Sequence, residues 1–422
     1  MDFQSNRFYH IISYGCQANM SDSEHYAGQL EELGYHNTED LDTADVILIN
    51  TCCVRETAED KTLGKIGELK HLKKQNPDLI IAVTGCMAQE WQDKLFKRAP
   101  HIDLVIGTHN IHKLIELIRE RRSKADHYMA ADMTLPAFHD MPVKRFQKFF
   151  AWIPIMNGCN KFCTYCIVPY VRGREVSRPI DAIVEEIKKV AAEGYKEITL
   201  LGQNVNSYGL DLKDGTDFSK LVAAVDDIDG IERVRYMTSH PKDMTFAMID
   251  AIADSKKVVN HMHLPIQCGS DELLKKMNRG YTVEHYLELV DYARKRMPDL
   301  VLTTDIIVGF PGETEAMFED TLNLLKRVQY DMAYTFIYSP RTGTPAAKME
   351  DQIPQEEKSR RLQRLMDVQN VYSLAKNKEM EDHVYDVIVE GPTNNDANHW
   401  FGRTTGNKMI IWENDGSVAI GD

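Results

Sequence analysis

The chain has 422 residues, more than one average domain, so we expect two or three domains with a sizeable core. Apolar residues make up 43% of it, and no run approaches the roughly 18 uninterrupted apolar residues of a membrane-spanning helix. We therefore expect a soluble protein with no membrane partner. The net charge of −14 argues against a protein that coats nucleic acid by bulk charge, although local basic groups remain.

The first residues contain no export signal, so we expect a cytoplasmic protein. In that compartment the eight cysteines are expected to be ligands or free thiols rather than disulfides.

Residues 1–122 are predicted to form an α/β domain with a parallel sheet, because short β-branched runs alternate with amphipathic stretches. The expected strands are 8–13, 46–50, 80–84 and 104–107. The first helix is expected to begin at a capping box, Ser21 to Glu24, and to end at Gly34. Residues 123–148 have mixed charge, Pro136 and Pro142 and no clear period, which predicts a linker.

A second alternation of strands and helices predicts a partial (β/α)6 barrel with a following helix over residues 149–369. The expected strands lie near 151–156, 197–201, 232–238, 261–266, 301–308 and 333–338. In the first helix, Pro179 suits the first turn, Ile180, Ile183, Ile187 and Val190 form the apolar stripe, and Gly194 ends it. An open doubly wound sheet is the alternative that periodicity alone leaves open.

Beyond Pro354 we expect a charged helix and then a small β module over residues 370–422. Its expected antiparallel strands lie around 383–390, 408–412 and 417–420.

Three cysteines, Cys159, Cys163 and Cys166, lie within eight residues directly after the first expected barrel strand. Three thiolates on a cubane 4Fe-4S cluster leave one iron without a protein ligand, and that iron can chelate the amino and carboxylate groups of an amino acid. A structural zinc site is the alternative, but zinc prefers four closed ligands. The spacing therefore predicts an iron–sulfur cluster with an open coordination site.

Three further cysteines, Cys16, Cys52 and Cys86, each lie just past an expected strand. Because the carboxyl ends of parallel strands share one edge of a sheet, these thiols are predicted to converge and to hold a second cluster. Buried cysteines in ordinary turns are the alternative. Cys53 and Cys268 have no matching partners and are predicted to be packing thiols.

Four short motifs, in this order, carry a resemblance to a known family. They are Tyr14-Gly15-Cys16-Gln17-Ala18-Asn19, Asn50-Thr51-Cys52-Cys53-Val54-Arg55-Glu56, Gly85-Cys86-Met87-Ala88-Gln89, and Met156-Asn157-Gly158-Cys159 through Cys166-Ile167-Val168-Pro169-Tyr170 with Arg172-Gly173-Arg174-Glu175. Together they resemble the radical S-adenosylmethionine (SAM) methylthiotransferases. The neighbours of the first three cysteines are most similar to those of the tRNA-2-methylthio-N6-dimethylallyladenosine synthases.

The resemblance implies an N-terminal methylthiotransferase domain, a radical SAM barrel and a C-terminal RNA-binding β-barrel of the TRAM type, which looks incomplete here. It implies two 4Fe-4S clusters, two SAM molecules per turnover, and sulfide or polysulfide on the N-terminal cluster. The implied reaction adds a methylthio group to C2 of N6-isopentenyladenosine at position 37 of tRNA, next to the anticodon. The implied partners are a tRNA anticodon stem-loop, an electron donor such as flavodoxin or ferredoxin, and a sulfur source. We expect a monomer.

The expected SAM contacts lie in loops at the carboxyl ends of the barrel strands. They are Gly202, Gln203 and Asn204, then Ser239, Gln267, Gly309 and Glu313. By resemblance, the first loop should meet the methionine amino group and the last should face the adenine. The expected RNA contacts are Arg172, Arg174 and Arg178 near the barrel mouth, and Trp400 and Arg403 in the C-terminal module. Core packing is the alternative for Trp400 and Phe401.

Three rival functions remain open at this point. The first is the same chemistry on threonylcarbamoyladenosine of tRNA or on an aspartate of a ribosomal protein. The second is an iron–sulfur carrier or scaffold, which has no use for six barrel units with polar loops. The third is a pure RNA-binding protein, which the acidic composition does not favour.

Overall fold

The computed structural model describes residues 7–53, 56–124, 126–133 and 141–422, and its chain divides into two compact units. The first unit comprises residues 1–146, 157–160 and 167–176, and the second comprises 147–156, 161–166 and 177–422. Val54 and Arg55 of the second cysteine motif, and Pro136 of the expected linker, lie outside the described residues. Within the described residues, none of the helices combines the length and apolar character needed to cross a membrane.

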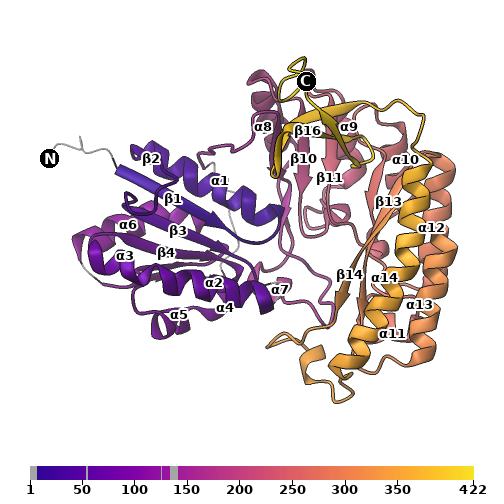
Figure 1. The fold of residues 1–422 in the computed structure, drawn as a ribbon, viewed down its shortest axis with the longest axis horizontal. Coiled ribbons are helices and arrows are strands. Elements are labelled where there is room, and N and C mark those ends of the chain that lie inside the picture. The colour runs from indigo at the N-terminus through magenta and orange to yellow at the C-terminus, as the bar shows by residue number, and fades with distance from the viewer. Residues whose placement is uncertain (1–6, 54–55, 125, 134–140) are drawn as a thin grey trace. The chain divides into compact units, whose positions relative to one another are not determined.

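The first unit is a three-layer α/β/α domain around a six-stranded parallel sheet (Figure 1). Its elements are β1 (Arg7–Ser13), α1 (Gln17–Glu32), β2 (Tyr35–Asn37), β3 (Val46–Thr51), α2 (Glu56–Glu68), α3 (Lys70–Gln75), β4 (Ile80–Gly85), α4 (Cys86–Trp91), α5 (Asp93–Arg98), β5 (Leu104–Ile106), η1 (Ile111–Lys113), α6 (Leu114–Ser123), β6 (Tyr128–Ala130) and, from a later segment, α7 (Val168–Val171).

The alternation of side chains along the strands gives this sheet two apolar faces. Leu48 and Ala82 pack with α1 and α6, whereas Ile49 and Val83 pack with the helices that follow β3 and β4. The strand order is β2-β1-β3-β4-β5-β6, so the direction of the crossovers reverses between β1 and β3. The predicted parallel α/β domain is confirmed.

Three expectations for this unit are settled by the structure. The helix begins directly after Cys16, so Ser21 and Glu24 lie inside α1 and form no capping box. Gly34, at φ +79°, follows the helix end as predicted. The expected linker contains β6, which adds the last parallel strand to the sheet by pairing with β5.

The second unit is a partial barrel followed by a long helix and a small β module. Its elements are β7 (Phe150–Pro154), α8 (Ile180–Ala192), β10 (Glu197–Leu201), η2 (Val205–Ser207), α9 (Phe218–Asp226), β11 (Arg233–Tyr236), η3 (Pro241–Asp243), α10 (Phe246–Asp254), β12 (His261–His263), α11 (Asp271–Lys276), α12 (Val283–Arg296), β13 (Val301–Val308), α13 (Glu315–Val328), β14 (Met332–Ile337), η4 (Ala346–Lys348), α14 (Gln355–Lys378), β15 (Val387–Thr393), β16 (Asp396–Thr404) and β17 (Met409–Glu413). The short strands β8 (Met156–Asn157) and β9 (Val176–Ser177) each have one residue in either unit.

The parallel strands β7, β10, β11, β12, β13 and β14 of this unit follow one another in chain order. They form the sheets β7-β10-β11 and β12-β13-β14, and a bridge between Val234 and Val258 connects β11 to the segment before β12. Outward-facing apolar residues such as Ile198 and Leu302 pack against the surrounding helices. This order confirms the partial barrel and rejects the doubly wound alternative.

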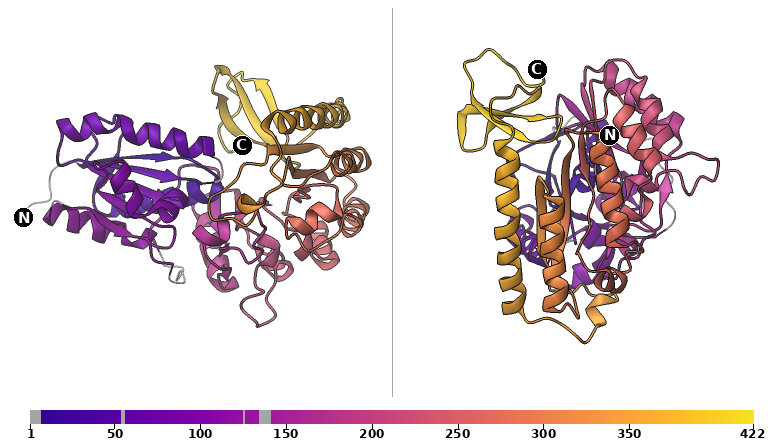
Figure 2. Two further views of the ribbon diagram at one scale, coloured as in Figure 1. Left: turned by 90° about the horizontal axis from the view of Figure 1, so that it is seen from below. Right: turned by 90° about the vertical axis from the view of Figure 1, so that its right-hand side faces the viewer.

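The C-terminal module is a three-stranded antiparallel sheet that packs against the barrel (Figure 2). Arg233 donates to the carbonyl of Arg403 at 2.9 Å, and Arg235 donates to that of Thr404 at 3.0 Å. Sequence analysis missed β16, the central strand, and residues 417–420 form no strand.

Candidate cluster and cofactor sites

Cys16, Cys52 and Cys86 all lie at the carboxyl edge of the first unit's sheet. Cys16 precedes α1 just after β1, Cys52 follows β3, and Cys86 opens α4 directly after β4. Cys16 and Cys52 therefore flank the point where the crossovers reverse, which is where open α/β sheets bind ligands.

A buried polar network holds the loops of Cys16 and Cys52 together. The Asn19 side-chain amide donates to the carbonyl of Thr51 at 3.0 Å and to Asn50 Oδ1 at 3.1 Å. Asn50 in turn donates to the Asn19 carbonyl at 2.7 Å and to Ser23 Oγ at 2.9 Å. Gly15, at φ +123°, is required because a Cβ there would lie 2.6 Å from that of Cys52. Sequence analysis did not assign Asn19 or Asn50 a role.

The thiol of Cys86 has a neighbouring thiol and a cation. Its hydrogen bond with Cys53 and the charge of Arg172 lower its pKa to about 6, against the opposing effect of burial. The same hydrogen bond, together with burial, raises the pKa of Cys53. Cys53 and Cys86 pack with Ile167 and Val171 in a small apolar cluster. Cys53 is thus a packing thiol that also contacts an expected ligand.

Among the described side chains, no three His, Cys, Asp or Glu gather closely enough to hold a single metal ion. A cubane differs from a single ion because it takes each thiolate on a different iron, so its ligands stand further apart. The all-thiol donor set suits iron–sulfur clusters, whereas zinc sites of this kind need a fourth ligand.

In the second unit, the segment of Cys163 and Cys166 is fixed by Arg279, which is 4% exposed. Its Nη1 lies 3.4 Å from Cys163 Sγ and 3.4 Å from the hydroxyl of Tyr165. Its Nη2 donates to the Pro265 carbonyl at 2.8 Å. Burial raises the pKa of Tyr165. Cys159 belongs to the first unit, where its backbone N–H donates to the carbonyl of Gly173 at 3.0 Å.

Buried polar atoms without partners mark the carboxyl ends of β10 and β11. They are Gln203 Oε1, Asn204 Oδ1, Ser239 Oγ and His240 Nε2. Burial, followed by the charges of Arg279 and Lys161, lowers the pKa of His240, so the ring is neutral. Buried polar groups normally have partners, so this group of atoms fits a polar ligand such as the methionine part of SAM.

Asp243 fixes the shape of this region. It accepts from Asn204 Nδ2 at 2.6 Å and from Lys161 Nζ at 2.6 Å. Gly202 lies close to the core, because a Cβ there would come within 2.6 Å of Met156 Cγ. Asp243 was not identified from the sequence as a site residue.

Gln267, Gly309 and Glu313 lie in the remaining strand-end loops. Gln267, at φ +74°, exchanges backbone hydrogen bonds with Asp305 and Ile307. Glu313 accepts from the Gly309 backbone N–H and from Arg361 Nη1, each at 2.7 Å, and burial raises its pKa. Its carboxylate is therefore engaged with α14, which argues against the predicted adenine contact through this side chain.

The basic residues after the cysteine motif differ in exposure. Arg172 is buried and pairs with Asp22 at 2.8 Å, so the prediction that it contacts RNA conflicts with its position. Arg174 is exposed. Arg178 is partly buried, pairs with Glu186 at 2.7 Å and donates to the Pro154 carbonyl at 2.6 Å.

In the C-terminal sheet, Trp400 and Arg403 lie on β16. Trp400 is half-buried and is opposite Trp412 on β17, so it packs within the sheet and also offers ring surface. Arg403 pairs with Glu390 at 2.9 Å and keeps about a third of its side chain exposed.

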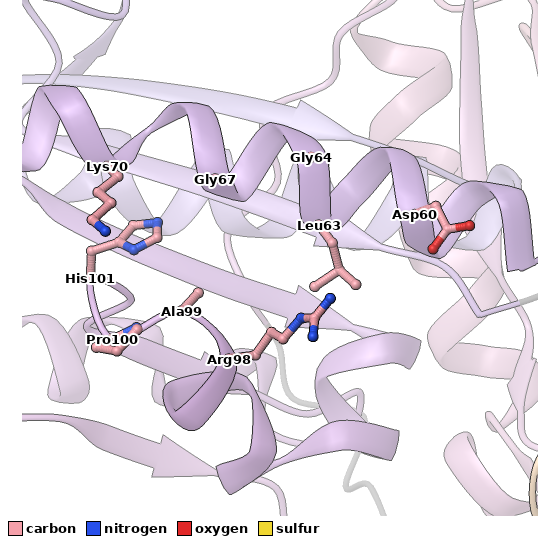
Figure 3. Close-up of a pocket in the computed structure, with 9 residues that line it drawn as sticks. All are labelled: Asp60, Leu63, Gly64, Gly67, Lys70, Arg98, Ala99, Pro100 and His101. Atoms are coloured by element: carbon pink, nitrogen blue, oxygen red, sulfur yellow. The ribbon is translucent and has the colours of Figure 1, made fainter.

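A groove of about 480 Å³ lies elsewhere on the first unit (Figure 3). Gly64 and Gly67 of α2 form one wall, and the segment from Arg98 to His101 forms the other. Arg98 and Lys70 at its rim are exposed, and none of the predicted site residues lines it.

Comparison with known proteins agrees with this geometry. Residues 153–325 match the model of the Radical SAM superfamily, and residues 8–107 match that of Uncharacterized protein family UPF0004. The fold resembles that of TsrM, a radical S-adenosylmethionine methyltransferase from Kitasatospora setae, with a TM-score of 0.61 and 15% identity over 81% of this chain and 74% of that one. A partial parallel barrel of this kind, with Cys163 and Cys166 in the loop after its first strand, defines the class of radical SAM enzymes.

Three curated relatives are named tRNA-2-methylthio-N(6)-dimethylallyladenosine synthase. The one from Thermoanaerobacter pseudethanolicus is 51% identical over 98% of this chain and 88% of its own length. That from Carboxydothermus hydrogenoformans is 50% identical over 97% and 93%, and that from Clostridium botulinum strain Okra is 52% identical over 96% and 91%. The chain belongs to the tRNA-2-methylthio-N(6)-dimethylallyladenosine synthase family.

Proposed function

We propose that the protein is a tRNA methylthiotransferase that converts N6-isopentenyladenosine at position 37 into its 2-methylthio derivative. The observation that carries the proposal is the position of three thiols, Cys16, Cys52 and Cys86, at the switch point of the N-terminal sheet. A second set of thiols, separate from the set in the barrel, fits an enzyme that must also hold the sulfur to be inserted. The shared name of relatives about 50% identical over nearly the whole chain supports the same activity.

Each thiol set is assigned one 4Fe-4S cluster. Cys159, Cys163 and Cys166 hold the cluster that binds SAM, and Cys16, Cys52 and Cys86 hold the cluster that carries the sulfur to be inserted. When bound, SAM and the clusters would supply three things: a sulfur atom, a methyl group and a radical that removes hydrogen from C2. The protein positions these groups and the base.

The strand-end loops are assigned to SAM. Gln203, Asn204 and Ser239 present buried polar atoms without protein partners. Gln267 lies beyond the end of β12, where it forms an isolated bridge with Ile306. Gly202 and Gly309 let the backbone approach closely: a Cβ would meet Met156 at the first and Lys358 at the second. Glu313 supports the last loop through Arg361.

The RNA is assigned to Arg174, Arg178, Trp400 and Arg403, which combine cationic groups with one stacking surface. Arg172 is removed from this set because of its burial. Turnover also needs an electron donor such as flavodoxin or ferredoxin and a sulfur source. We expect a cytoplasmic monomer acting on the anticodon stem-loop.

Anaerobic reconstitution of three variants tests the assignment of the clusters. Replacing Cys16, Cys52 and Cys86 with alanine should halve the bound iron and abolish methylthio transfer, while leaving reductive cleavage of SAM measurable. Replacing Cys159, Cys163 and Cys166 should also halve the iron but abolish cleavage. Cys268→Ala is the matched control, because this buried thiol lies in the barrel core and should not affect iron content.

Loss of SAM cleavage in a folded variant lacking only Cys16, Cys52 and Cys86 would contradict the assignment of cleavage to the other cluster.

Mass analysis of tRNA digests tests the substrate. A methylthio adduct on threonylcarbamoyladenosine, or on a ribosomal protein, would replace the proposed substrate. Absence of 5′-deoxyadenosine under reduction would instead favour a carrier or scaffold.

A further inference from the structure

The segment that follows Cys166 returns to the first unit. Residues 167–176 belong to that unit, and α7 packs there beside α4, the helix that Cys86 opens. His109 Nε2 lies 2.9 Å from the carbonyl of Arg172, and the Thr108 hydroxyl donates to the carbonyl of Val171. These interactions fix the position of Arg172 at the carboxyl edge of the N-terminal sheet.

Within this segment Arg172 forms a buried ion pair with Asp22 of α1. The Nη2 to Oδ2 distance is 2.8 Å, and the two side chains are 6% and 15% exposed. A buried pair of this kind is weak evidence for a contribution to stability, because removing two charges from water offsets most of their attraction. Apolar residues of similar volume would stabilise the fold equally well. Stability therefore does not explain why a charged pair occupies this position, and the residues around it have to.

Those neighbours are the thiols assigned to the N-terminal cluster. Arg172 hydrogen bonds to the Cys86 thiol and interacts electrostatically with Cys16 as well. Arg172 lowers the pKa of the Cys86 thiol and Asp22 raises it, so the two charges of the pair act on this thiol with opposite signs. Val171, the adjacent residue, packs directly with Cys53 and Cys86.

We infer that Arg172 is a positioning residue that raises the reduction potential of the cluster on Cys16, Cys52 and Cys86, and that the carboxylate of Asp22 opposes this effect. The inference rests on the proposed function, which assigns a cluster to these thiols. A cluster with three thiolate ligands is anionic and gains a further negative charge on reduction. A fixed cation beside it favours the reduced form and raises the potential, whereas a carboxylate opposes this effect.

A purely structural ion pair is the alternative, and the sign of the shift separates the two. Breaking a structural pair from either side loosens the same contact, so both variants should change the cluster in the same direction. If the charges of the pair act on the cluster, Arg172→Gln lowers its reduction potential because it removes the cation. Asp22→Asn then raises the potential because it removes the anion.

The experiment uses full-length protein in which Cys159, Cys163 and Cys166 are alanine, so that only the N-terminal cluster is reconstituted. Its potential is measured by a redox titration monitored by electron paramagnetic resonance, after iron and sulfide have been counted. The controls are Lys73→Gln and Asp103→Asn, from an ion pair of the same unit with a 2.8 Å separation and similar burial. Asp103 precedes β5 and so lies at the amino edge of the sheet, opposite the thiols.

Shifts of opposite sign for Arg172→Gln and Asp22→Asn, with neither control moving the potential, support the inference. Shifts of the same sign, no shift, or an equal shift in the controls overturn it. If Arg172→Gln does not fold, Asp22→Asn alone decides, because only a rise in potential agrees. If the parent protein binds no iron–sulfur cluster, the proposed function itself fails.

Discussion

The guanidinium of Arg279 lies 3.4 Å from the Cys163 sulfur, deep in the second unit. Arg279 sits three positions after α11, and Cys163 sits in the loop that follows the first barrel strand. The backbone N–H of Thr164 also donates to the carbonyl of Met277, so side chain and backbone fix the same loop. The barrel thus fixes the position of this cysteine through both a side chain and the backbone.

Replacing Arg279 tests whether it holds the loop of Cys163 in place. Arg279→Met should lower the free energy of unfolding of the cluster-free protein by about 2 kcal/mol, because the Pro265 carbonyl loses a charged donor. The loop should then open more often, so alkylation of the buried Cys163 relative to Cys166, measured by mass spectrometry, should become faster. Arg279→Lys should restore part of the protection. Equal alkylation rates in wild type and Arg279→Met would show that the backbone contacts alone hold the loop.

The Asn19 and Asn50 network should determine how well the N-terminal site is assembled. Asn50→Leu removes one hydrogen bond each from the Asn19 amide, the Asn19 carbonyl and Ser23, although Asn19 keeps Thr51 and Ser23 keeps Ser13. We therefore expect a decrease of roughly 2–3 kcal/mol in the free energy of urea unfolding. Iron bound by a protein that retains only the N-terminal cysteines should fall with it. Asn37→Ala, at an exposed position, is the control and should stay within about 0.5 kcal/mol. Full iron binding by Asn50→Leu would show that the cluster assembles this site unaided.

His261 should make the barrel sensitive to acid. Burial, together with the positive charges of His263, Arg235 and Lys408, lowers its pKa to about 3. A histidine with a depressed pKa in the folded protein contributes stability above its unfolded pKa of about 6.5, and this stability is lost as the pH falls from there towards 3.

The test compares unfolding of the cluster-free protein at pH 7 and pH 5. Wild type should lose roughly 2 kcal/mol more than His261→Gln, which does not titrate. His285→Gln, at a position where 41% of the side chain is exposed, should behave like wild type. An identical pH dependence in wild type and His261→Gln would show that the ring is protonated in the folded state.

Arg174 and Arg403 should contribute to RNA affinity by binding phosphates. The double alanine variant should bind an anticodon stem-loop more weakly and show a shallower dependence on salt, with the slope falling by about one unit for each arginine that no longer neutralises a phosphate. Arg327→Ala, on α13 and 57% exposed, is the matched control. An unchanged salt slope in the double variant would place the RNA elsewhere.

Local patterns predicted most strands because their residues are buried and β-branched. The run from Val46 to Thr51 is an example, since it is buried throughout and forms β3. They failed where tertiary interactions decide. Ser21 and Glu24 have capping-box spacing, but the helix starts at Gln17, and Ser23 accepts from Asn50. β16 has a polar first half and becomes a strand because it pairs with β15 and β17.

In the candidate site, too, the residues with a local signal were predicted and those placed by tertiary contacts were missed. The spacing of cysteines is visible in the sequence, and the rule that parallel strands end at one edge places Cys16, Cys52 and Cys86 at the carboxyl edge of the sheet, where the structure has them. The supporting residues carry no such signal: Arg172 and Asp22 are 150 positions apart, and Arg279 and Cys163 are 116 apart. Arg172 was misassigned to RNA because an arginine in a basic run looks exposed until its partner is known.

The assignment of residues 157–160 and 167–176 to the first unit bears on how the protein can be dissected. Cleavage after residue 146 would yield an N-terminal fragment lacking the strip that contains Val171 and Arg172, so Cys53, Cys86 and Asp22 would face water. Such a fragment should aggregate or lose its thiols to oxidation. The first unit therefore needs chain segments that lie beyond the apparent linker. A truncation boundary or fusion site belongs at another position.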